Sequence, residues 1–253
     1  MKVFITGASS GIGAALAVHY ASHGAILGLC ARRLEPTRAL AAKLGGQNAA
    51  YRADVTDPAS VRTAARDFME RFGAPDIVIA NAGVSIGTLT EKPEDIAVFR
   101  RVMDTNVLGL VATFQPFVVP LCSRASGTLV GIASVAGFRG LPGAGAYSAS
   151  KSAALAYLES LRVELRASGV AVVTICPGYV RTPMTAVNRY RMPFILDADE
   201  AARRFARAIA KKRRLAVIPW QMALVSIVLR CLPGWLYDRL FARAPRKARD
   251  PEL

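Results

Sequence analysis

The stretch VFITGASSGIGAAL, residues 3–16, decides the fold. A short apolar run leads into a glycine-rich loop, and a helical pattern follows the loop at once. Gly7 permits a sharp turn out of the strand, Gly11 lets the backbone approach a pyrophosphate, and Gly13 lets the helix pack closely on a sheet. The first turn of such a helix offers free N–H groups and a positive dipole end to phosphates. The stretch therefore predicts a dinucleotide site.

The same loop also fits a competing pattern, because it reads G-x-S-x-G, the nucleophile elbow of many hydrolases. That elbow needs a later acid and then a histidine that accepts the proton of Ser9. The only histidines, His19 and His23, lie on the helix directly after the loop and cannot fold back onto Ser9. Hydrolase chemistry is therefore excluded, and Ser9 and Ser10 become hydroxyl donors to the cofactor. The histidines have no carboxylate or cysteine beside them, so no metal site is expected.

The composition is that of a globular protein. The chain has 253 residues, of which 53% are hydrophobic and 20% charged, enough for one large α/β domain with a buried core. The first strand starts at Lys2, so we expect no targeting segment in front of it. Cys30 and Cys176 lie in apolar, strand-like runs, and no two of the four cysteines form a C-x-x-C pair. Reduced, buried thiols in a cytoplasmic protein are the prediction.

Strand-like runs alternate with longer helical patterns along most of the chain, and we expect one domain over residues 1–253. Several runs are uniformly apolar, as expected when both faces of a parallel sheet are covered. The fold class predicted is α/β, a doubly wound, Rossmann-like parallel sheet of about seven strands. The expected strands are Val3–Thr6, Ala25–Ala31, 47–52, Asp76–Ala80, Thr128–Ile132, Val170–Cys176 and Leu215–Ile218. The expected helices are Ile12–His23, Leu34–Leu44, Ala59–Phe72, Ile96–Val119, Tyr147–Ala167 and Asp199–Arg207.

The end of the second expected strand, Cys30-Ala31-Arg32-Arg33, indicates which cofactor binds. A protein that binds NAD usually ends this strand with an acid that accepts from the ribose 2′-hydroxyl. Ala31 occupies that place here, and the guanidinium groups of Arg32 and Arg33 suit a 2′-phosphate. The cofactor predicted is therefore NADP(H), in preference to NAD(H).

Tyr147 and Lys151 are four positions apart at the start of a helical run, so both side chains lie on one face, one turn apart. A phenol with a pKa of about 10 is a poor base at neutral pH. A nearby ammonium and a helix start both favour the phenolate, so we expect the pKa of Tyr147 to be lowered enough for general acid–base catalysis. Ser134 ends an apolar strand thirteen residues earlier, and a glycine-rich loop separates it from Tyr147.

Together these motifs resemble the short-chain dehydrogenase/reductase family in its single-domain form, over residues 1–185. TGASSGIG resembles the cofactor loop of that family, ADVTD the residues flanking the adenine, NAGV its central-strand motif, DTNVLG its helix asparagine motif, and PGYVRTPM the stretch that closes over the nicotinamide. The catalytic residues that the resemblance implies are Asn106, Ser134, Tyr147 and Lys151. With the two arginines added, the expected cofactor-binding residues are Gly7, Ser9, Ser10, Gly11, Ile12, Gly13, Arg32, Arg33, Asp54, Val55, Asn81, Ala82, Gly83, Tyr147, Lys151, Pro177, Gly178, Val180 and Thr182.

The resemblance implies an oxidoreductase that interconverts a ketone or aldehyde and an alcohol. Tyr147 is expected to exchange a proton with the substrate oxygen while a hydride passes to or from the nicotinamide, and Ser134 to stabilise charge on the same oxygen. Lys151 is expected to hold the ribose hydroxyls and lower the pKa of Tyr147. Asn106 is expected to position a water that links Lys151 to solvent. Family members commonly form dimers or tetramers, so a homodimer or homotetramer is expected.

Residues 186–253 depart from the family pattern. They are expected to hold a substrate-binding flap, the last strand and a basic, apolar extension with a helical hairpin broken at Pro233-Gly234. The net charge is +15, and 16 of the 33 Lys and Arg residues lie in residues 181–253. No nucleic-acid motif accompanies this charge, so no nucleic-acid partner is expected. The extension is interpreted first as packing on the domain or on another subunit; a lid over an apolar substrate and peripheral membrane contact are the alternatives.

The function predicted is that of an NADPH-dependent oxidoreductase, with a bulky apolar carbonyl compound as the substrate that the hydrophobic extension favours. Two alternatives are carried alongside it. One is a cofactor-binding sensor or scaffold on the same fold, because a fold does not fix a function. The complete set of Ser134, Tyr147 and Lys151 argues against that alternative. The other is a reductase that works on a lipid-like carbonyl compound at a membrane surface.

Overall fold

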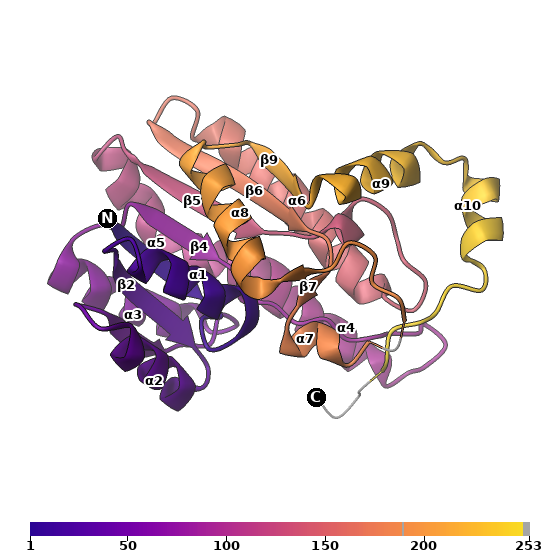
Figure 1. Ribbon diagram of the computed structural model, residues 1–253, viewed down its shortest axis with the longest axis horizontal. Helices are drawn as coiled ribbons and strands as arrows, with labels where there is room; N and C mark the ends of the chain where they lie inside the picture. The colour runs from indigo at the N-terminus through magenta and orange to yellow at the C-terminus, as the bar shows by residue number, and fades with distance from the viewer. Residues whose placement is uncertain (189, 250–253) are drawn as a thin grey trace.

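The computed structural model describes residues 1–188 and 190–249. Seven parallel strands form one sheet in the order β3-β2-β1-β4-β5-β6-β9, with helices on both faces (Figure 1). The strands are β1 (Lys2–Thr6), β2 (Ile26–Ala31), β3 (Ala49–Arg52), β4 (Ile77–Ala80), β5 (Gly127–Ile132), β6 (Val170–Pro177) and β9 (Leu215–Ile218). The predicted doubly wound fold is confirmed. The strand order reverses between β1 and β4, the place where proteins of this topology bind ligands.

The helices form one layer on each face of the sheet. Helices α1 (Gly11–Ala21), α2 (Leu34–Leu44) and α8 (Ala198–Ala210) cover one face, and α3 (Pro58–Phe72), α5 (Gly109–Ser123) and α6 (Gly145–Glu164) cover the other (Figure 1). Successive side chains of a strand point to opposite faces. Phe4 and Ile5 of β1 therefore enter different core clusters, and both are completely buried. This explains why the central strands are apolar at every position instead of alternating.

The helix expected over Ile96–Val119 contains a π-helical turn that the sequence did not predict. Helix α4 (Asp95–Met103), the π turn η1 (Asp104–Leu108) and α5 run as one helix of 29 residues, which is long and apolar enough to cross a membrane by length and composition. Half of its apolar window is buried inside the protein, and Phe114 and Phe117 of α5 are completely buried in the core. It is therefore a core helix, and Asn106 of its π turn is hydrogen-bonded to Val84, in the loop after β4.

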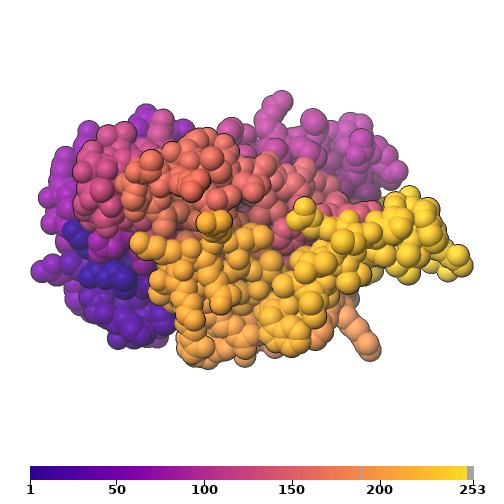
Figure 2. Space-filling model, turned by 90° about the horizontal axis from the view of Figure 1, so that it is seen from above, coloured from indigo at the N-terminus to yellow at the C-terminus, as the bar shows by residue number. Residues whose placement is uncertain are grey.

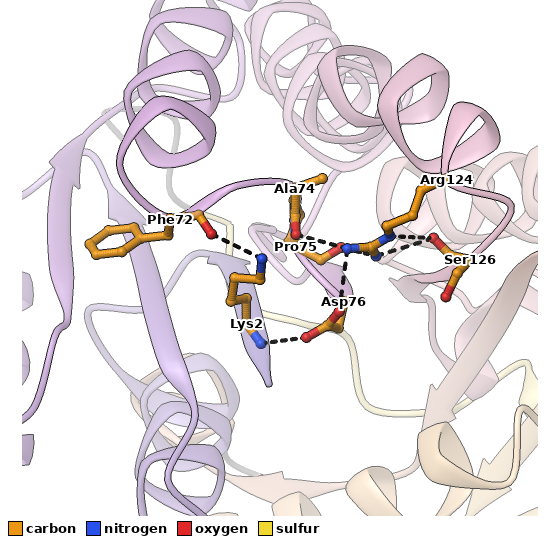
Figure 3. A network of polar contacts seen from close by, with 7 residues as sticks. All are labelled: Lys2, Phe72, Ala74, Pro75, Asp76, Arg124 and Ser126. Atoms are coloured by element: carbon orange, nitrogen blue, oxygen red, sulfur yellow. Dashed lines mark hydrogen bonds and ion pairs between the residues drawn. The ribbon is translucent and has the colours of Figure 1, made fainter.

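A polar network holds the amino-terminal edge of the sheet (Figure 3). The backbone N–H of Lys2 donates to the carboxylate of Asp76 (2.7 Å), and the Lys2 ammonium donates to the carbonyl of Phe72 (2.9 Å). The guanidinium of Arg124 donates to two carbonyls just before Asp76 and to one just before β5, and it lies 3.4 Å from the Asp76 carboxylate. The starts of β1, β4 and β5 are thereby tied together.

The region after β6 contains the predicted flap and extension. The flap holds the two-stranded pair β7 (Val180–Arg181) and β8 (Leu196–Asp197) and the short helix α7 (Pro183–Ala186). The predicted helical extension is present as α9 (Trp220–Cys231) and α10 (Gly234–Phe241), with the break at Pro233 where expected, but α10 lies at an angle to α9 and the two do not form a hairpin; both project from the body in gold and yellow (Figure 1). We call these two helices the arm. From α10 the chain turns back, and residues 242–249, here called the strap, return to the body beside α4.

Candidate active site

A cavity of about 540 Å³ opens at the carboxyl ends of the strands, where the strand order reverses. Its wall contains every cofactor-binding residue predicted from the sequence except Gly13. Of the predicted catalytic residues, Ser134, Tyr147 and Lys151 line the cavity, and Asn106 does not. The structure therefore brings together, from the segments that follow the six strands β1 to β6, residues that the sequence places up to 175 positions apart.

The glycine-rich loop between β1 and α1 has no space for side chains. The φ angles of Gly7 and Gly11 are +69° and +56°, values that L-residues rarely adopt. A Cβ atom at Gly13 would lie 2.3 Å from the carbonyl oxygen of Gly7. The side-chain amide of Asn81 donates to the carbonyls of Thr6 (3.0 Å) and Gly7 (3.2 Å), which ties the loop to the end of β4. The first turn of α1 is thereby held at the cavity with N–H groups available to an anion.

One end of the cavity is basic. The last residue of β2, Ala31, and the exposed Arg32 and Arg33 line this end. Asp54 is the one acid among the described lining residues, and its carboxylate already accepts hydrogen bonds from the backbone N–H (3.0 Å) and hydroxyl (2.8 Å) of Thr56. The two guanidinium groups therefore face the cavity without a carboxylate opposite them.

The other end of the cavity carries the polar groups of α6 and β5. The ammonium of Lys151 donates to the carbonyl of Ile132 (2.9 Å) and lies 5.8 Å from the centre of the Tyr147 ring. Lys151 is only 5% exposed, and this burial lowers the pKa of its ammonium to about 8. The hydroxyl oxygen of Ser134 accepts from the N–H of Ala136 (3.1 Å), which fixes the serine at the cavity wall.

The pKa of Tyr147 shifts in the direction opposite to the sequence-based expectation. Burial raises it, and the neighbouring Ser134 hydroxyl opposes part of the rise. The ring edge is half-buried because it opens on the cavity, but the phenol lies deep enough for loss of solvation to dominate. The Lys151 ammonium is directed to a backbone carbonyl and stands over the ring instead of beside the phenol oxygen. Burial therefore favours the neutral form of the Tyr147 phenol.

Asn106 is buried in the π turn η1 and lies outside the cavity wall, where it contacts residues that adjoin the wall. Its side-chain oxygen accepts from the N–H of Val84 (2.8 Å), and its amide donates to the carbonyl of Val84 (2.9 Å) and to the hydroxyl of Ser150 (2.9 Å). Ser150 directly precedes Lys151 on α6. The side chain of Asn106 thus joins the loop after β4 to the helix that carries Lys151, and the expected water-mediated relay through Asn106 stays a prediction.

The cavity wall also contains residues that the sequence reasoning did not include among the cofactor-binding positions. They are Ala31, Ala53, Val84, Thr105, Ile132, Ala133, Pro183, Met184 and Thr185. Each of them lies within three residues of a predicted site residue along the chain. Extending each motif by one to three residues would therefore have included them all. Pro183 to Thr185 belong to the short helix α7, whose formation had no sequence signal beyond the proline.

This fold and cavity define a class of protein that the comparisons with known families identify. The family described as short chain dehydrogenase matches residues 1–192. The chain belongs to the short-chain dehydrogenase/reductase family, whose members bind NAD(P)(H) and act on CH–OH and C=O groups.

Individual relatives cover nearly the whole chain. An uncharacterized oxidoreductase of Myxococcus xanthus (strain DK1622) is 38% identical over 237 residues, which cover 92% of this chain and 93% of the relative. Dehydrogenase/reductase SDR family member 7B of Bos taurus is 32% identical over 268 residues, covering 98% of this chain and 82% of the relative. Among solved structures, an alcohol dehydrogenase of Thermococcus sibiricus in complex with 5-hydroxy-NADP is 29% identical, covers 86% of this chain and 94% of that one, and has a TM-score of 0.75.

Proposed function

We propose that the chain is an NADP(H)-dependent oxidoreductase that interconverts a ketone or aldehyde and an alcohol by proton transfer through Tyr147. One observation carries the proposal. Ser134, Tyr147 and Lys151 line the same cavity as the glycine-rich loop and the two arginines.

The described residues fit an extended dinucleotide. Side chains at Gly7 and Gly13 would collide with the protein itself, so these glycines let the loop pack closely on itself and on the end of β4, and the start of α1 supplies N–H groups for the pyrophosphate. Asp54 and Val55 would hold the adenine end, and Val180 and Thr182 the carboxamide of the nicotinamide. When bound, the cofactor supplies or accepts a hydride; the protein supplies position and electrostatic field.

The side chains at the catalytic end divide the work on the substrate oxygen. Tyr147 donates its phenol proton to that oxygen during reduction, and in the oxidation direction its phenolate form accepts the proton of the alcohol. The hydroxyl of Ser134 donates a hydrogen bond to the same oxygen and stabilises its developing charge. Lys151 binds the ribose hydroxyls. With a pKa of about 8, its ammonium is able to lose and regain a proton near neutral pH.

Activity is tested by following NADPH oxidation across a panel of aldehydes and ketones, with larger apolar compounds included because we propose a bulky apolar substrate. Turnover that disappears in Ser134→Ala supports the proposal. NADPH binding without turnover of any compound would overturn it, and would favour a cofactor-binding sensor on the same fold.

The preference for NADP(H) depends on Arg32 and Arg33. Replacing both by alanine removes two charged donors to the 2′-phosphate, so the KM for NADPH is expected to rise by about tenfold to a hundredfold while the KM for NADH stays unchanged. Arg38→Ala is the matched control, because this exposed arginine of α2 pairs with Glu35 at 2.9 Å and lies outside the cavity. An equal loss for both cofactors would contradict the preference.

We place the protein in a reducing, cytoplasmic compartment and expect a homodimer or homotetramer. The buried Cys30 and Cys176 are free thiols, which supports the location. Exposed apolar side chains on the outer surface of α4, η1, α5 and α6 support self-association; they include Ile96, Leu108, Val119 and Val163. Light scattering of the purified chain measures the subunit number directly.

A further inference from the structure

Helix α9 presents its apolar face to solvent. Met222 and Ser226 are buried against the body, whereas Leu224, Ile227 and Val228 are each more than half exposed. A helix on the surface of a globular protein normally buries its aliphatic stripe and exposes its serines. In α9 a serine is buried while three aliphatic side chains are exposed, and these three have no partner among the described residues.

The exposed apolar surface continues along both helices of the arm. Large side chains that are 55% to 69% exposed recur over 21 positions, and a tryptophan stands at the start of each helix. They are Trp220, Leu224, Ile227, Val228, Trp235 and Leu240. Tryptophan side chains are enriched where an apolar phase meets water, because the ring is apolar and its N–H is polar.

The arm is fixed in this orientation by polar contacts on its inner side. The guanidinium of Arg139 donates to the carbonyls of Leu229 (3.0 Å) and Leu232 (3.1 Å) at the end of α9. The same guanidinium lies 4.3 Å from the centre of the Tyr237 ring, and the Tyr237 hydroxyl donates to the carbonyl of Gly140. Both anchoring residues of the body lie in the loop between Ser134 and Tyr147. The outward direction of the aliphatic face is therefore part of the fold.

A basic hollow adjoins the start of the arm. It has a volume of about 490 Å³ and is lined by Arg204, Arg207, Lys211, Arg213, Ile218 and Trp220, among others. Among the residues that the structure describes, Arg204 pairs with Glu200 (2.6 Å), and no carboxylate lies within ion-pair distance of the other three cations. Figure 2 shows the yellow arm projecting from the body next to the orange residues of α8 and β9. Trp220 lines the basic hollow and is also the first exposed apolar side chain of the arm, so the two surfaces adjoin.

We propose that the arm and the basic hollow together bind the surface of an anionic phospholipid bilayer. Helices of 12 and 8 residues are too short to span a bilayer but suit a position in the plane of its interface. Anionic headgroups neutralise the unpaired cations, and the aliphatic face enters the acyl boundary. A second copy of the chain fits less well, because a two-fold contact through this surface brings like charges together.

The strap extends this inference to the substrate, in a step that rests on the proposed reductase function. The N–H of Gly87, in the loop after β4, donates to the carbonyl of Ala248 (2.9 Å), and the guanidinium of Arg249 binds Glu94 and Asp95 (both 2.8 Å). The arm is thus joined to the loops after β4 and β5, beside the catalytic end of the cavity. A bilayer-bound arm places that end at the lipid surface, so the substrate class is an apolar carbonyl compound dissolved in the membrane.

The test is co-sedimentation of the full chain with vesicles of phosphatidylcholine, with and without phosphatidylglycerol. Binding is expected only to the anionic vesicles, and it is expected to fall as salt is added. Removing two cations by Lys211→Ala and Arg213→Ala is expected to weaken binding by about fivefold for each charge. Removing two anchors by Trp220→Ala and Trp235→Ala is expected to weaken it by about tenfold.

Matched controls are Arg62→Ala on α3 and Val18→Ser on α1, which change an exposed cation and an exposed apolar side chain of the body. NADPH binding shows that each variant is folded. Equal sedimentation of all variants, or none by the full chain, would overturn the proposal. A third outcome would also overturn it: the full chain does not bind lipid, and the tryptophan variant has a changed subunit number. The arm would then be a subunit interface. Because sedimentation needs no turnover, an inactive chain that binds vesicles refutes the proposed function and leaves the bilayer contact intact.

Discussion

The two edges of the same sheet hold polar groups under opposite conditions. At the amino-terminal edge, Asp76 and Arg124 are partly exposed and have protein partners at 2.7–3.4 Å (Figure 3). At the carboxyl edge, burial lowers the pKa of Lys151 and raises the pKa of Tyr147, which in both cases favours the neutral form. We expect the first edge to stabilise the fold and the second to lower its stability, because burial opposes the charged form of Lys151. Substitutions at the two edges should therefore change stability and activity independently.

The largest effect is expected at the carboxyl edge, from Tyr147→Phe. The phenol is the only group of that side chain able to exchange a proton, so kcat for a carbonyl substrate should fall by about a thousandfold. Its loss removes no contact in the glycine-rich loop, so the Kd for NADPH should be unchanged. Stopped-flow reduction and fluorescence titration measure the two quantities. Retained turnover would contradict the proposed catalytic role of Tyr147, and with it the contrast between the two edges.

Lys151→Met sharpens the comparison, because it should raise stability while it removes activity. Burial lowers the pKa of Lys151 from 10.5 to about 8, a cost of about 3 kcal/mol, and the lost hydrogen bond to Ile132 offsets about 1 kcal/mol of the gain. The net gain expected at neutral pH is therefore about 2 kcal/mol.

The pH dependence gives the sign of this effect. Below about pH 8 the lysine is charged in both the folded and the unfolded chain, so the whole cost of burial is present. Between about pH 8 and 10.5 the unfolded chain binds more protons, so the stability of the original chain rises with pH and the advantage of the variant disappears. Urea unfolding at neutral and alkaline pH measures it. A destabilised Lys151→Met variant at neutral pH would contradict the prediction.

Arg124→Ala tests the amino-terminal edge. It removes charged hydrogen bonds to three carbonyls and is expected to lower the free energy of unfolding by about 1–2 kcal/mol without changing KM or kcat. Arg66→Ala is the control: its pair with Glu70 is about 70% exposed on both sides, and its loss should change stability by less than about 0.5 kcal/mol. A change in cofactor affinity with Arg124→Ala would show that the two edges are coupled.

The smallest effect is expected from Arg249→Gln in the strap. The guanidinium holds the pKa of Asp95 below its usual range, so the contact is present at neutral pH and is lost only as pH falls through that lowered value. Removing the charge should release the strap and speed its cleavage by trypsin, with the rest of the chain as resistant as before. Arg243→Gln, an exposed residue just after α10, is the control. Unchanged cleavage would mean that Gly87 and Asn188 hold the strap without Arg249.

The sequence predicted those features that depend on local backbone geometry. Gly7 and Gly11 adopt positive φ, and the spacing of Tyr147 and Lys151 puts both on one helix face, so the loop, the fold and the cavity wall were predictable. The π turn around Asn106 was not, because it depends on how two helical segments pack on the rest of the domain. The direction of the Tyr147 pKa was also missed, since it follows from burial and from where the Lys151 ammonium points. The exposed aliphatic face of α9 could not be predicted either, because it depends on how the helix is held against the rest of the protein.

The path of the strap has a practical consequence for handling the protein. An affinity tag or fluorescent fusion added after the last residue would extend a segment whose backbone already contacts the loop at Gly87. Met1 is 51% exposed and directly precedes β1, at the label N in Figure 1, whereas the cavity opens at the carboxyl ends of the strands. Fusions therefore belong at the amino-terminal end, and kinetic data from carboxyl-tagged preparations should be compared with those from the cleaved protein.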